Sequence, residues 1–383
     1  TDPEKLLQRL SLSESILIEN SPFIPDYALL AEIGIYLATM VLVWVFLNFF
    51  GVTWGLVFFL LTNALIAYLG VYFIQSNLLI DVTWSLISGF ITGSIAFYLN
   101  FREQYKLRQQ IKKQFEHYLD PRQVKKLQDN PELLKLGGEK RYATYLFTDV
   151  RGFTSMSESL PPEDVTYIMN RALTAQQKSV QKYEGMVDKY IGDEIMALFG
   201  EKEEKLSITA YNAIKSAIEM QESLKNFQEP SIKLNIGIGI HIGRIIVGTV
   251  GSQERMDSTV VGDAVNISSR LQELTKKYNS KIIISGSIWR ILNKSKHDFL
   301  AREINKLHLR GSSKPITVFE IYNSEDVASI DYKNKTKNIY NNALNSYYNK
   351  KWQESMSLFE KCLKLNPNDR VVKSHLDVCV NKI

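Results

Sequence analysis

The chain has 383 residues and a formal net charge of +5, with 23% charged and 45% apolar residues, which is close to globular averages. This length allows two or three domains, and the mild charge without a long basic run argues against nucleic acid as a partner. The two cysteines, Cys362 and Cys379, lack metal-ligand spacing. We therefore expect both to be reduced core residues of a cytosolic domain.

Three apolar runs follow a polar segment of residues 1–27. They cover about Ala28–Phe50, Trp54–Ile74 and Val82–Phe101. Each run is long enough to cross a hydrocarbon core of about 30 Å as a helix. The alternative is three buried core helices, which runs of about 20 residues with so few charges disfavour. We therefore predict a membrane-embedded hairpin of three transmembrane helices over residues 28–101.

Basic residues after the third run predict the orientation in the membrane. Asp81 marks the loop before this run, whereas five basic residues crowd its exit, namely Arg102, Lys106, Arg108, Lys112 and Lys113. Cytoplasmic loops carry an excess of positive charge. We therefore expect a multi-pass plasma-membrane protein with residues 1–27 outside and the chain from Arg102 onward in the cytoplasm.

Residues 102–136 are predicted to be transducer helices. A narrow apolar stripe recurs at helical spacing in the first of them, formed by Leu107, Ile111, Phe115 and Tyr118. Such a stripe suits pairing with a second copy as a coiled coil, or packing on the chain's own domain. Asp120-Pro121 ends this helix, and a shorter helical stretch follows over Val124–Leu136.

Strands and helices alternate from Tyr142 to Tyr322. Helices are expected at residues 162–183, 206–227, 264–278 and 287–293, and strands at 143–147, 186–191, 195–199, 232–242, 245–250, 281–285 and 316–321. Alternation of this kind predicts an α/β or α+β domain, with a mostly antiparallel sheet covered by helices.

Residues 333–383 have a helical composition rich in Asn, Lys and Tyr. Aromatic and apolar positions between Tyr347 and Pro367 resemble a single tetratricopeptide unit of about 34 residues, a short helical hairpin. Ser355 departs from this pattern, because a small alanine is usual there. One such unit cannot bury its own apolar face, so we expect it to pack on a neighbouring domain or on a protein partner.

The first chemical motif is Ala143–Thr154, in which an apolar strand ends at Asp149 and a turn containing Gly152 leads into a helix. Backbone N–H groups of such a turn attract phosphate, and the carboxylate can hold the divalent cation that accompanies phosphates. By itself this motif is weak, because an aspartate at a strand end is more often a cap or turn residue.

The second motif, Lys189–Glu194, is a hairpin with Asp193 at its tip. Two aspartates from adjacent strand ends could hold two divalent cations about 4 Å apart, as in-line phosphoryl displacement requires. A plain polar hairpin turn is the alternative.

Two further motifs follow downstream. Glycines between Gly237 and Gly248 indicate a bulge or the close approach of another backbone, and His241 among them is interpreted as a structural strand residue. In Thr259–Arg270 a strand turns into a helix that carries Asn266 and Arg270 four residues apart on one face. Arg270 could meet phosphates and Asn266 a sugar, or they could be a surface arginine and a capping asparagine.

In this order, from about Leu136 to Tyr322, the motifs resemble the catalytic domain of class III nucleotidyl cyclases, the adenylate and guanylate cyclase family. The resemblance covers about half of the chain and implies a ferredoxin-like α+β domain at residues 137–323. It implies that Asp149 and Asp193 bind two ions of Mg²⁺ or Mn²⁺ per active site. The loop along the phosphates would consist of Val150, Arg151, Gly152, Phe153 and Thr154.

The resemblance also assigns the purine and transition-state positions. Lys189 matches the purine-selecting lysine of adenylate cyclases, where guanylate cyclases carry Glu, and Thr259 matches the second purine position, which is Asp in many members and Thr or Ser in a subgroup. Asn266 and Arg270 match the pair that orients the ribose and stabilises phosphate charge. Lysine only donates hydrogen bonds, so it can face adenine N1 but not the N1–H of guanine. The expected substrate is ATP, and the expected product is cyclic AMP.

One departure concerns the terminal phosphates, for which the family often places a lysine after the glycine of a late strand. Here Ser312 follows Gly311, so either Lys314 or Arg310 substitutes or nucleotide affinity is weakened. Family members build each site from two chains, and because this chain holds every residue the resemblance implies a homodimer with two equivalent sites. The three spans resemble cyclases with an extracytoplasmic CHASE-type sensor, of which residues 1–27 would be the remnant.

Three alternatives remain open. Lys189 disfavours a guanylate cyclase. Ile191–Glu194 resembles the signature hairpin of diguanylate cyclases, but that family lacks the Thr259–Arg270 motif. A catalytically inactive receptor or scaffold on the cyclase fold usually loses a metal aspartate or the Asn/Arg pair, and all four residues are present here.

Overall fold

The computed structural model describes residues 27–49, 51–76, 78–130, 137–200, 205–225, 234–252, 254, 256–309 and 314–383. The chain divides into two compact units, Thr1–Tyr118 and Leu119–Ile383.

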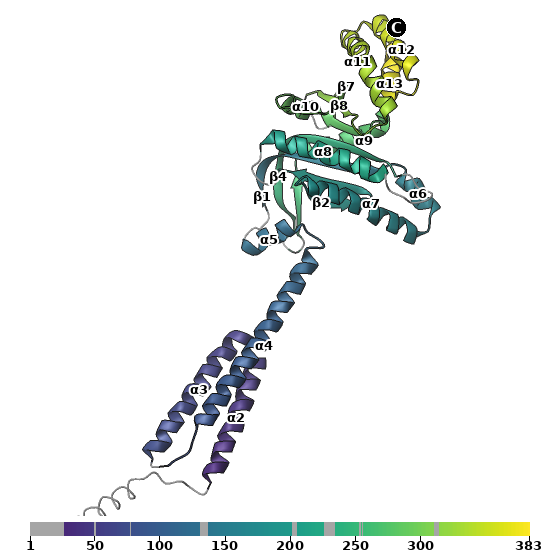
Figure 1. Ribbon diagram of the computed structural model, residues 1–383. Coiled ribbons are helices and arrows are strands. Elements are labelled where there is room, and N and C mark those ends of the chain that lie inside the picture. The colour runs from purple at the N-terminus through teal and green to yellow at the C-terminus, as the bar shows by residue number, and fades with distance from the viewer. Residues whose placement is uncertain are drawn as a thin grey trace, which may run out of the picture. The chain divides into compact units, whose positions relative to one another are not determined.

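The first unit contains three apolar helices packed side by side, α2 (Ala28–Phe49), α3 (Gly51–Gln75) and α4 (Thr83–Phe115) (Figure 1). All three are long and apolar enough to cross a membrane, which confirms the prediction of three such helices. Large apolar side chains such as Trp54 and Phe90 are exposed on them. The third run and the predicted helix after it form one continuous helix, α4.

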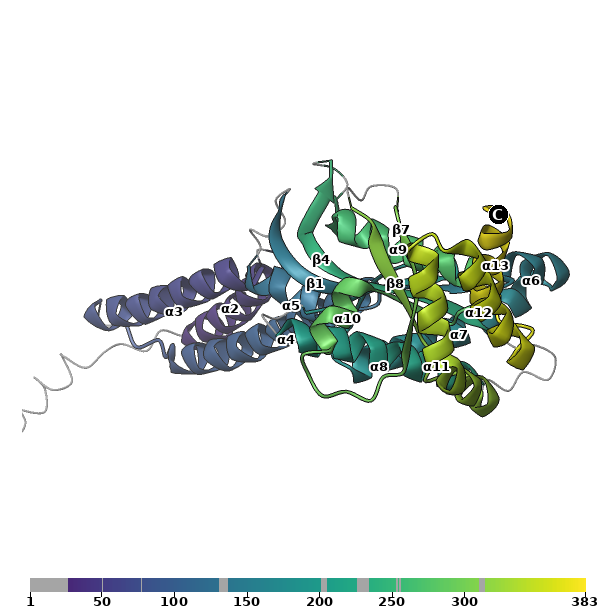
Figure 2. The ribbon, with the colours of Figure 1, turned by 90° about the horizontal axis from the view of Figure 1, so that it is seen from above.

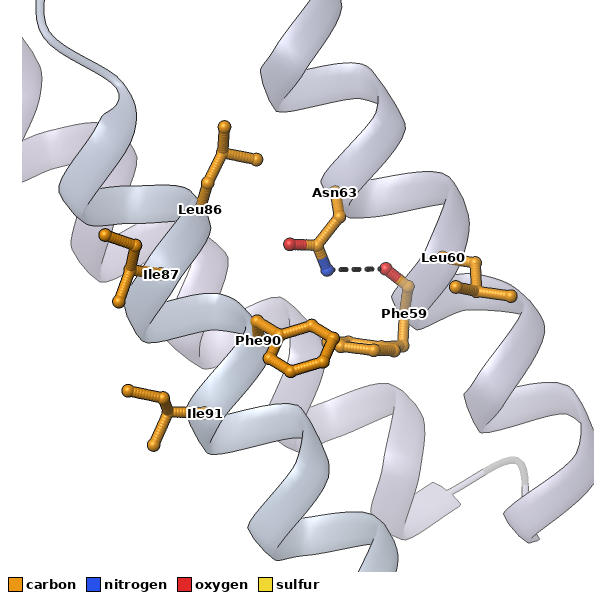
Figure 3. A pocket seen from close by; sticks show the side chains of 7 residues that line it. All are labelled: Phe59, Leu60, Asn63, Leu86, Ile87, Phe90 and Ile91. Atoms are coloured by element: carbon orange, nitrogen blue, oxygen red, sulfur yellow. Dashed lines mark hydrogen bonds between the residues drawn. The ribbon is translucent and has the colours of Figure 1, made fainter.

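Polar groups among these helices are satisfied within the unit. Glu32 accepts a hydrogen bond of 2.8 Å from the backbone N–H of Asp81, which ties the loop before α4 to α2. A cavity of about 370 Å³ between α3 and α4 is lined by apolar side chains and Asn63 (Figure 3). The Asn63 amide donates to the carbonyl of Phe59 at 2.8 Å, so its own helix satisfies this group. Asn63 therefore fits an apolar helix without a polar partner on another helix.

The second unit begins with α5 (Pro121–Asp129) and is built on one eight-stranded sheet. Its order is β2-β3-β1-β4-β6-β8-β7, with β5 paired to β4, and every pair is antiparallel except β4–β6. The strands are β1 (Gly137–Val150), β2 (Met186–Ile191), β3 (Glu194–Phe199), β4 (Ile236–Gly251), β5 (Met256–Val261), β6 (Ile282–Ser285), β7 (Ala301–Leu307) and β8 (Ile316–Ile321). The first four strands follow the βαββαβ order of ferredoxin-like motifs.

Helices cover both faces of this sheet, as predicted for an α+β domain. A short helix, α6 (Phe153–Ser159), precedes α7 (Pro162–Lys182), and α7 packs with α8 (Leu206–Lys225) and α10 (Gly286–Leu292) over one face (Figures 1 and 2). The other face is covered by α9 (Asp263–Tyr278), which lies against β4 and β1. The main core forms under α7 and α8 and includes Leu146, Phe199 and Ile214.

Several strand predictions differ from the structure: β1 is longer than the predicted 143–147, and the list of predicted strands does not include β5. The runs 232–242 and 245–250 are one strand, β4, because Gly243 and Arg244 keep their pairing with Ala143 and Tyr142 of β1. Strand β7 is missing from the prediction, because its sequence AREINKL lacks an apolar alternation. The strand carries Arg302, a charged residue that the fold buries.

The C-terminal region folds as three helices, α11 (Val327–Tyr348), α12 (Trp352–Leu365) and α13 (Arg370–Val380). Helix α11 begins before the predicted boundary at 333, since Asp326 caps it by accepting a hydrogen bond from the N–H of Ser329. Helix α13 extends the predicted hairpin.

The apolar faces of these helices form a shared core with α9, β6, β7 and β8 (Figure 2). Cys362 and Cys379 are free and buried in this core, as expected. The neighbour on which this region packs is thus the sheet domain of the same chain.

Candidate active site

The two predicted metal aspartates lie next to each other. Asp149 stands near the end of β1, and Asp193 follows Gly192 at the tip of the β2–β3 hairpin, where Gly192 has a φ of 61°. Strands β1 and β3 are antiparallel neighbours with Thr148 opposite Ile195, which brings the two strand ends together. The backbone N–H of Val150 donates to Oδ2 of Asp193 at 3.1 Å. The structure therefore brings the predicted pair together.

These carboxylates carry more negative charge than their surroundings neutralise. Lys276 of α9 places its ammonium 2.7 Å from Oδ2 of Asp149, but the lysine side chain is 58% exposed. Burial and then the charge of Asp149 raise the pKa of Asp193. Burial also raises the pKa of Glu194, and Asp149 and Asp193 contribute to this rise. The cluster thus combines three carboxylates with one exposed ammonium.

This donor set fits hard divalent cations. Carboxylate oxygens are the ligands that Mg²⁺ and Mn²⁺ prefer. A bound cation would offset both causes of the raised pKa values, burial first and then repulsion between the carboxylates. Within the described ranges no three acidic, histidine or cysteine side chains could enclose an ion by themselves. Mg²⁺ commonly binds one or two carboxylates and completes its shell with water and substrate phosphates. Glu194 was not among the candidate residues predicted from the sequence for this cluster, although it directly follows Asp193.

The loop after Asp149 is braced by its arginine. The Arg151 guanidinium donates to the carbonyls of Ser280 at 2.6 Å and Thr275 at 3.1 Å, and to Oδ1 of Asn279 at 3.0 Å. The Arg151 side chain therefore ties the loop to the turn after α9. Burial lowers its pKa.

The rest of the loop leads into α6. Gly152 adopts a φ of 75° just before this helix, with open space where a side chain would stand. Phe153 packs against the main core. Between these anchors the backbone, rather than the Arg151 side chain, is the part of the predicted phosphate loop that is available to a ligand.

The two predicted purine-contacting residues lie on β2 and β5. Lys189 of β2 places its ammonium 2.8 Å from Oδ2 of Asp257 on β5. Thr259 lies two residues further along β5, and therefore on the same face of the strand. Burial raises the pKa of the neighbouring Asp188 to about 6, although Lys189 opposes this rise. Asp257 is a contact that sequence reasoning missed.

Helix α9 carries the other two predicted residues, Asn266, which is exposed, and Arg270, which is half-buried. This helix lies unusually close to β4, because a Cβ at Gly239 would overlap backbone atoms of Ser268 and Gln272. The glycine motif of β4 therefore reflects the close approach of a helix, one of the two predicted reasons.

His241 of β4 is buried, and its Nδ1 shares a hydrogen bond of 2.7 Å with the Ser285 hydroxyl. Burial lowers its pKa to about 4, so the ring is neutral near pH 7. This geometry agrees with a structural role. Of the two residues predicted to replace the missing phosphate lysine, Lys314 lies just before β8, whereas Arg310 lies outside the described residues, as does Ser312.

Carboxylates at the end of a central antiparallel strand, beside a glycine turn that opens into a helix, are typical of domains that handle nucleotide phosphates and their cations. Residues 138–322 match the family model of the adenylate and guanylate cyclase catalytic domain. This match covers just under half of the chain, so residues 138–322 are similar to catalytic domains of this family.

Two relatives named adenylate cyclase are similar to this chain. The chain is 33% identical over 245 residues to the terminal-differentiation specific adenylate cyclase of Dictyostelium discoideum, a match that covers 63% of this chain and 11% of that protein. It is 38% identical over 191 residues to an adenylate cyclase of Anabaena cylindrica, which covers 47% of this chain and 37% of the relative. The chain thus spans 11% of the first relative's length and 37% of the second's.

A bacterial light-regulated adenylyl cyclase superposes with a TM-score of 0.51 at 22% identity, covering 59% of this chain and 65% of that structure. At this identity the similarity shows the fold alone.

Proposed function

We propose that this chain is a membrane-anchored adenylate cyclase that converts ATP to 3′,5′-cyclic AMP and pyrophosphate. The observation that carries the proposal is the predicted purine position, where the ammonium of Lys189 lies 2.8 Å from Asp257, two residues before Thr259 on β5, in a domain similar to the cyclase family. An ammonium donates to adenine N1 and would meet the N1–H of guanine as a second donor. The two relatives compared above bear the name adenylate cyclase, which supports the same substrate.

The proposed reaction forms a bond between the ribose 3′-oxygen and the α-phosphorus and breaks the bond from the α-phosphorus to the bridging oxygen. Pyrophosphate leaves, and the 3′-hydroxyl proton passes to water. Two ions of Mg²⁺ or Mn²⁺ at Asp149 and Asp193 would lower the pKa of the 3′-hydroxyl and neutralise phosphate charge. Arg270 stabilises the charge that grows on the α-phosphate, and Asn266 orients the ribose. The backbone of Val150–Thr154 lies along the phosphates.

The proposal includes a homodimer in which each site combines Asp149 and Asp193 of one copy with the purine residues and α9 residues of the other. Exposed apolar side chains on β4 and β5 support a second copy, among them Ile246, Val250, Met256 and Val261. The helical stripe Leu107, Ile111, Phe115 and Tyr118 is exposed as well and suits a parallel coiled coil.

The proposed membrane topology places the N-terminus outside and the catalytic domain in the cytoplasm, because basic residues gather after the third apolar helix. The native cysteines Cys362 and Cys379 are buried and should give little background labelling. A Ser13→Cys variant should react with an impermeant thiol reagent on intact cells, whereas Asn338→Cys, on the exposed side of α11, should not. The reverse pattern would refute this topology.

Finer assignments of the terminal regions belong to the proposal as well. Residues 1–27 would be the remnant of a CHASE-type sensor, and α11–α13 would be a tetratricopeptide-like unit. Because these helices already bury an apolar face on the catalytic domain, a protein partner would bind their remaining surface.

The substrate is tested with the full-length protein in detergent, supplied with ATP or GTP and with Mg²⁺ or Mn²⁺. Cyclic AMP should form faster than cyclic GMP. The double variant Lys189→Glu with Thr259→Cys should lose ATP use and gain some GTP use, because Glu accepts hydrogen bonds from the guanine N1–H and amine. Faster formation of cyclic GMP by the wild-type protein would contradict the proposal.

The shared site is tested by co-expression of two inactive chains. Asp149→Ala loses a metal ligand and Arg270→Ala loses phosphate stabilisation, so each homodimer should be nearly inactive. A mixed dimer has one site with both lesions and one intact site. With random pairing roughly a quarter of the wild-type sites are restored. No rescue, in a preparation shown to contain heterodimers, would exclude shared sites.

A further inference from the structure

The ion pair between Lys189 and Asp257 joins two strands that are not neighbours in the sheet. Strand β2 lies at one edge, whereas β5 pairs with β4. The Lys189 ammonium nevertheless lies 2.8 Å from Oδ2 of Asp257. Because side chains alternate along a strand, Asp257 and Thr259 share one face of β5. A carboxylate therefore lies within the purine position of the proposed site.

The lysine and the aspartate together offer a donor beside an acceptor. Adenine presents the complementary pair, the N1 acceptor beside the N6 amine donor, whereas guanine presents the N1–H donor beside the O6 acceptor. The Thr259 hydroxyl can both donate and accept, so it distinguishes the two purines poorly. Asp257 only accepts when it is ionised, and its side chain is 70% exposed, so Oδ1 is open to a ligand.

We propose that Asp257 is a specificity-determining residue, which accepts a hydrogen bond from the adenine N6 amine and holds the Lys189 ammonium toward N1. This inference rests on the proposed adenylate cyclase function and adds a residue to its purine site.

The chain offers a matched control for a plain surface ion pair. Lys215 and Asp298 lie 3.2 Å apart, and their side chains are 26% and 70% exposed, the same values as for Lys189 and Asp257. Exposed pairs of this kind contribute little by themselves. Asp298→Ala therefore removes an exposed carboxylate that pairs with a lysine, and it leaves the purine site unchanged.

The experiment compares wild type, Asp257→Ala, Asp257→Glu and Asp298→Ala as full-length protein in detergent. It measures kcat/KM for ATP and GTP, and the dissociation constants of 3′-deoxy-ATP and 3′-deoxy-GTP, which lack the attacking hydroxyl. Asp257→Ala should lose about 10- to 100-fold in kcat/KM for ATP, mainly through KM. Its affinity for 3′-deoxy-ATP should fall by a similar factor while 3′-deoxy-GTP binding changes little. Asp257→Glu should recover part of the loss, and Asp298→Ala should match wild type.

The binding ratio of the two deoxynucleotides decides the inference. An Asp257→Ala protein that keeps the wild-type preference for 3′-deoxy-ATP overturns it, and so does an equal loss of both nucleotides. A wild-type protein that forms no cyclic AMP overturns the proposed function instead. In that case the ratio of the two deoxynucleotides still reports whether Asp257 selects the purine.

Discussion

Two clusters of charge in the same unit are organised in opposite ways. Arg302 of β7 is buried and contacts Glu320 of β8 at 2.5 Å and Asp369 of α13 at 2.8 Å. Lys333 of α11 lies 3.1 Å from Glu320 and 2.6 Å from Glu325. Asp369 also caps α13 by accepting from the N–H groups of the next turn. Every charge in this cluster, named here the β7 cluster, has an opposite partner.

The metal cluster, formed by Asp149, Asp193 and Glu194 with Lys276, lacks such balance. Burial raises the pKa of Asp193, and the charge of Asp149 adds to the rise. Burial also acts on Asp369, but there the Arg302 guanidinium wins and holds the pKa of the carboxyl below its usual value. The difference teaches that the fold pairs one set of charges and leaves the other set incompletely paired, which supports the proposal that the second set binds cations.

The largest effect is expected in the β7 cluster. Arg302→Met leaves Glu320 and Asp369 buried without their main partner, and breaking a buried pair in this way costs about 3–5 kcal/mol. Thermal or urea unfolding of the full-length protein measures this loss. Unfolding unchanged from wild type would mean that the β7 cluster does not hold α13 on the sheet.

The metal cluster should respond in activity rather than stability. Asp149→Asn removes a ligand charge, and loss of one preorganised electrostatic group costs about 10²–10³ in kcat. The melting temperature should stay the same or rise, because repulsion with Asp193 disappears. Cyclase activity and melting are measured on the same preparation. An active variant, or an inactive variant that is unfolded, would remove the contrast between the clusters.

Asp188, beside the purine position, gives a pH test. Burial raises its pKa to about 6 from an ordinary value of 3.8. The unfolded chain thus loses the Asp188 proton at a lower pH than the folded chain. The contribution of Asp188 to the free energy of unfolding therefore falls as the pH rises from about 4 to 6, and it stays low above about pH 6. Asp188→Asn should remove this fall and be more stable at pH 7 by on the order of 2 kcal/mol. If the free energy of unfolding depended on pH in the same way in Asp188→Asn and in wild type, the raised pKa of Asp188 would be refuted.

The smallest effect is expected at an exposed pair. Lys182 of α7 and Glu219 of α8 lie 2.8 Å apart with side chains 57% and 34% exposed. Solvent screens such a pair, so Lys182→Ala should leave melting and cyclase activity close to wild type. A clear loss of stability in Lys182→Ala would mean that an exposed ion pair also stabilises the fold. Burial would then not explain the difference between the two clusters.

Sequence patterns predicted candidate residues where local chemistry indicates them. Asp149 and Asp193 stand where apolar strands end in glycine turns, and Asn266 and Arg270 share a helix face. The contact of Lys189 with Asp257 and the burial of Arg302 could not be predicted, because both depend on partners far away in the chain. The glycines of β4 predicted either a bulge or the close approach of another backbone. The position of α9 against Gly239 decides between these two explanations.

The most direct test of the central claim is equilibrium Mn²⁺ binding, followed by EPR on the full-length protein with 3′-deoxy-ATP. Wild type should bind Mn²⁺, and Asp298→Asn, a distant exposed carboxylate variant, should bind it equally well. Asp149→Asn and Asp193→Asn should bind Mn²⁺ at least about 10-fold more weakly while remaining folded. Wild-type Mn²⁺ affinity in a folded Asp149→Asn protein would contradict the account.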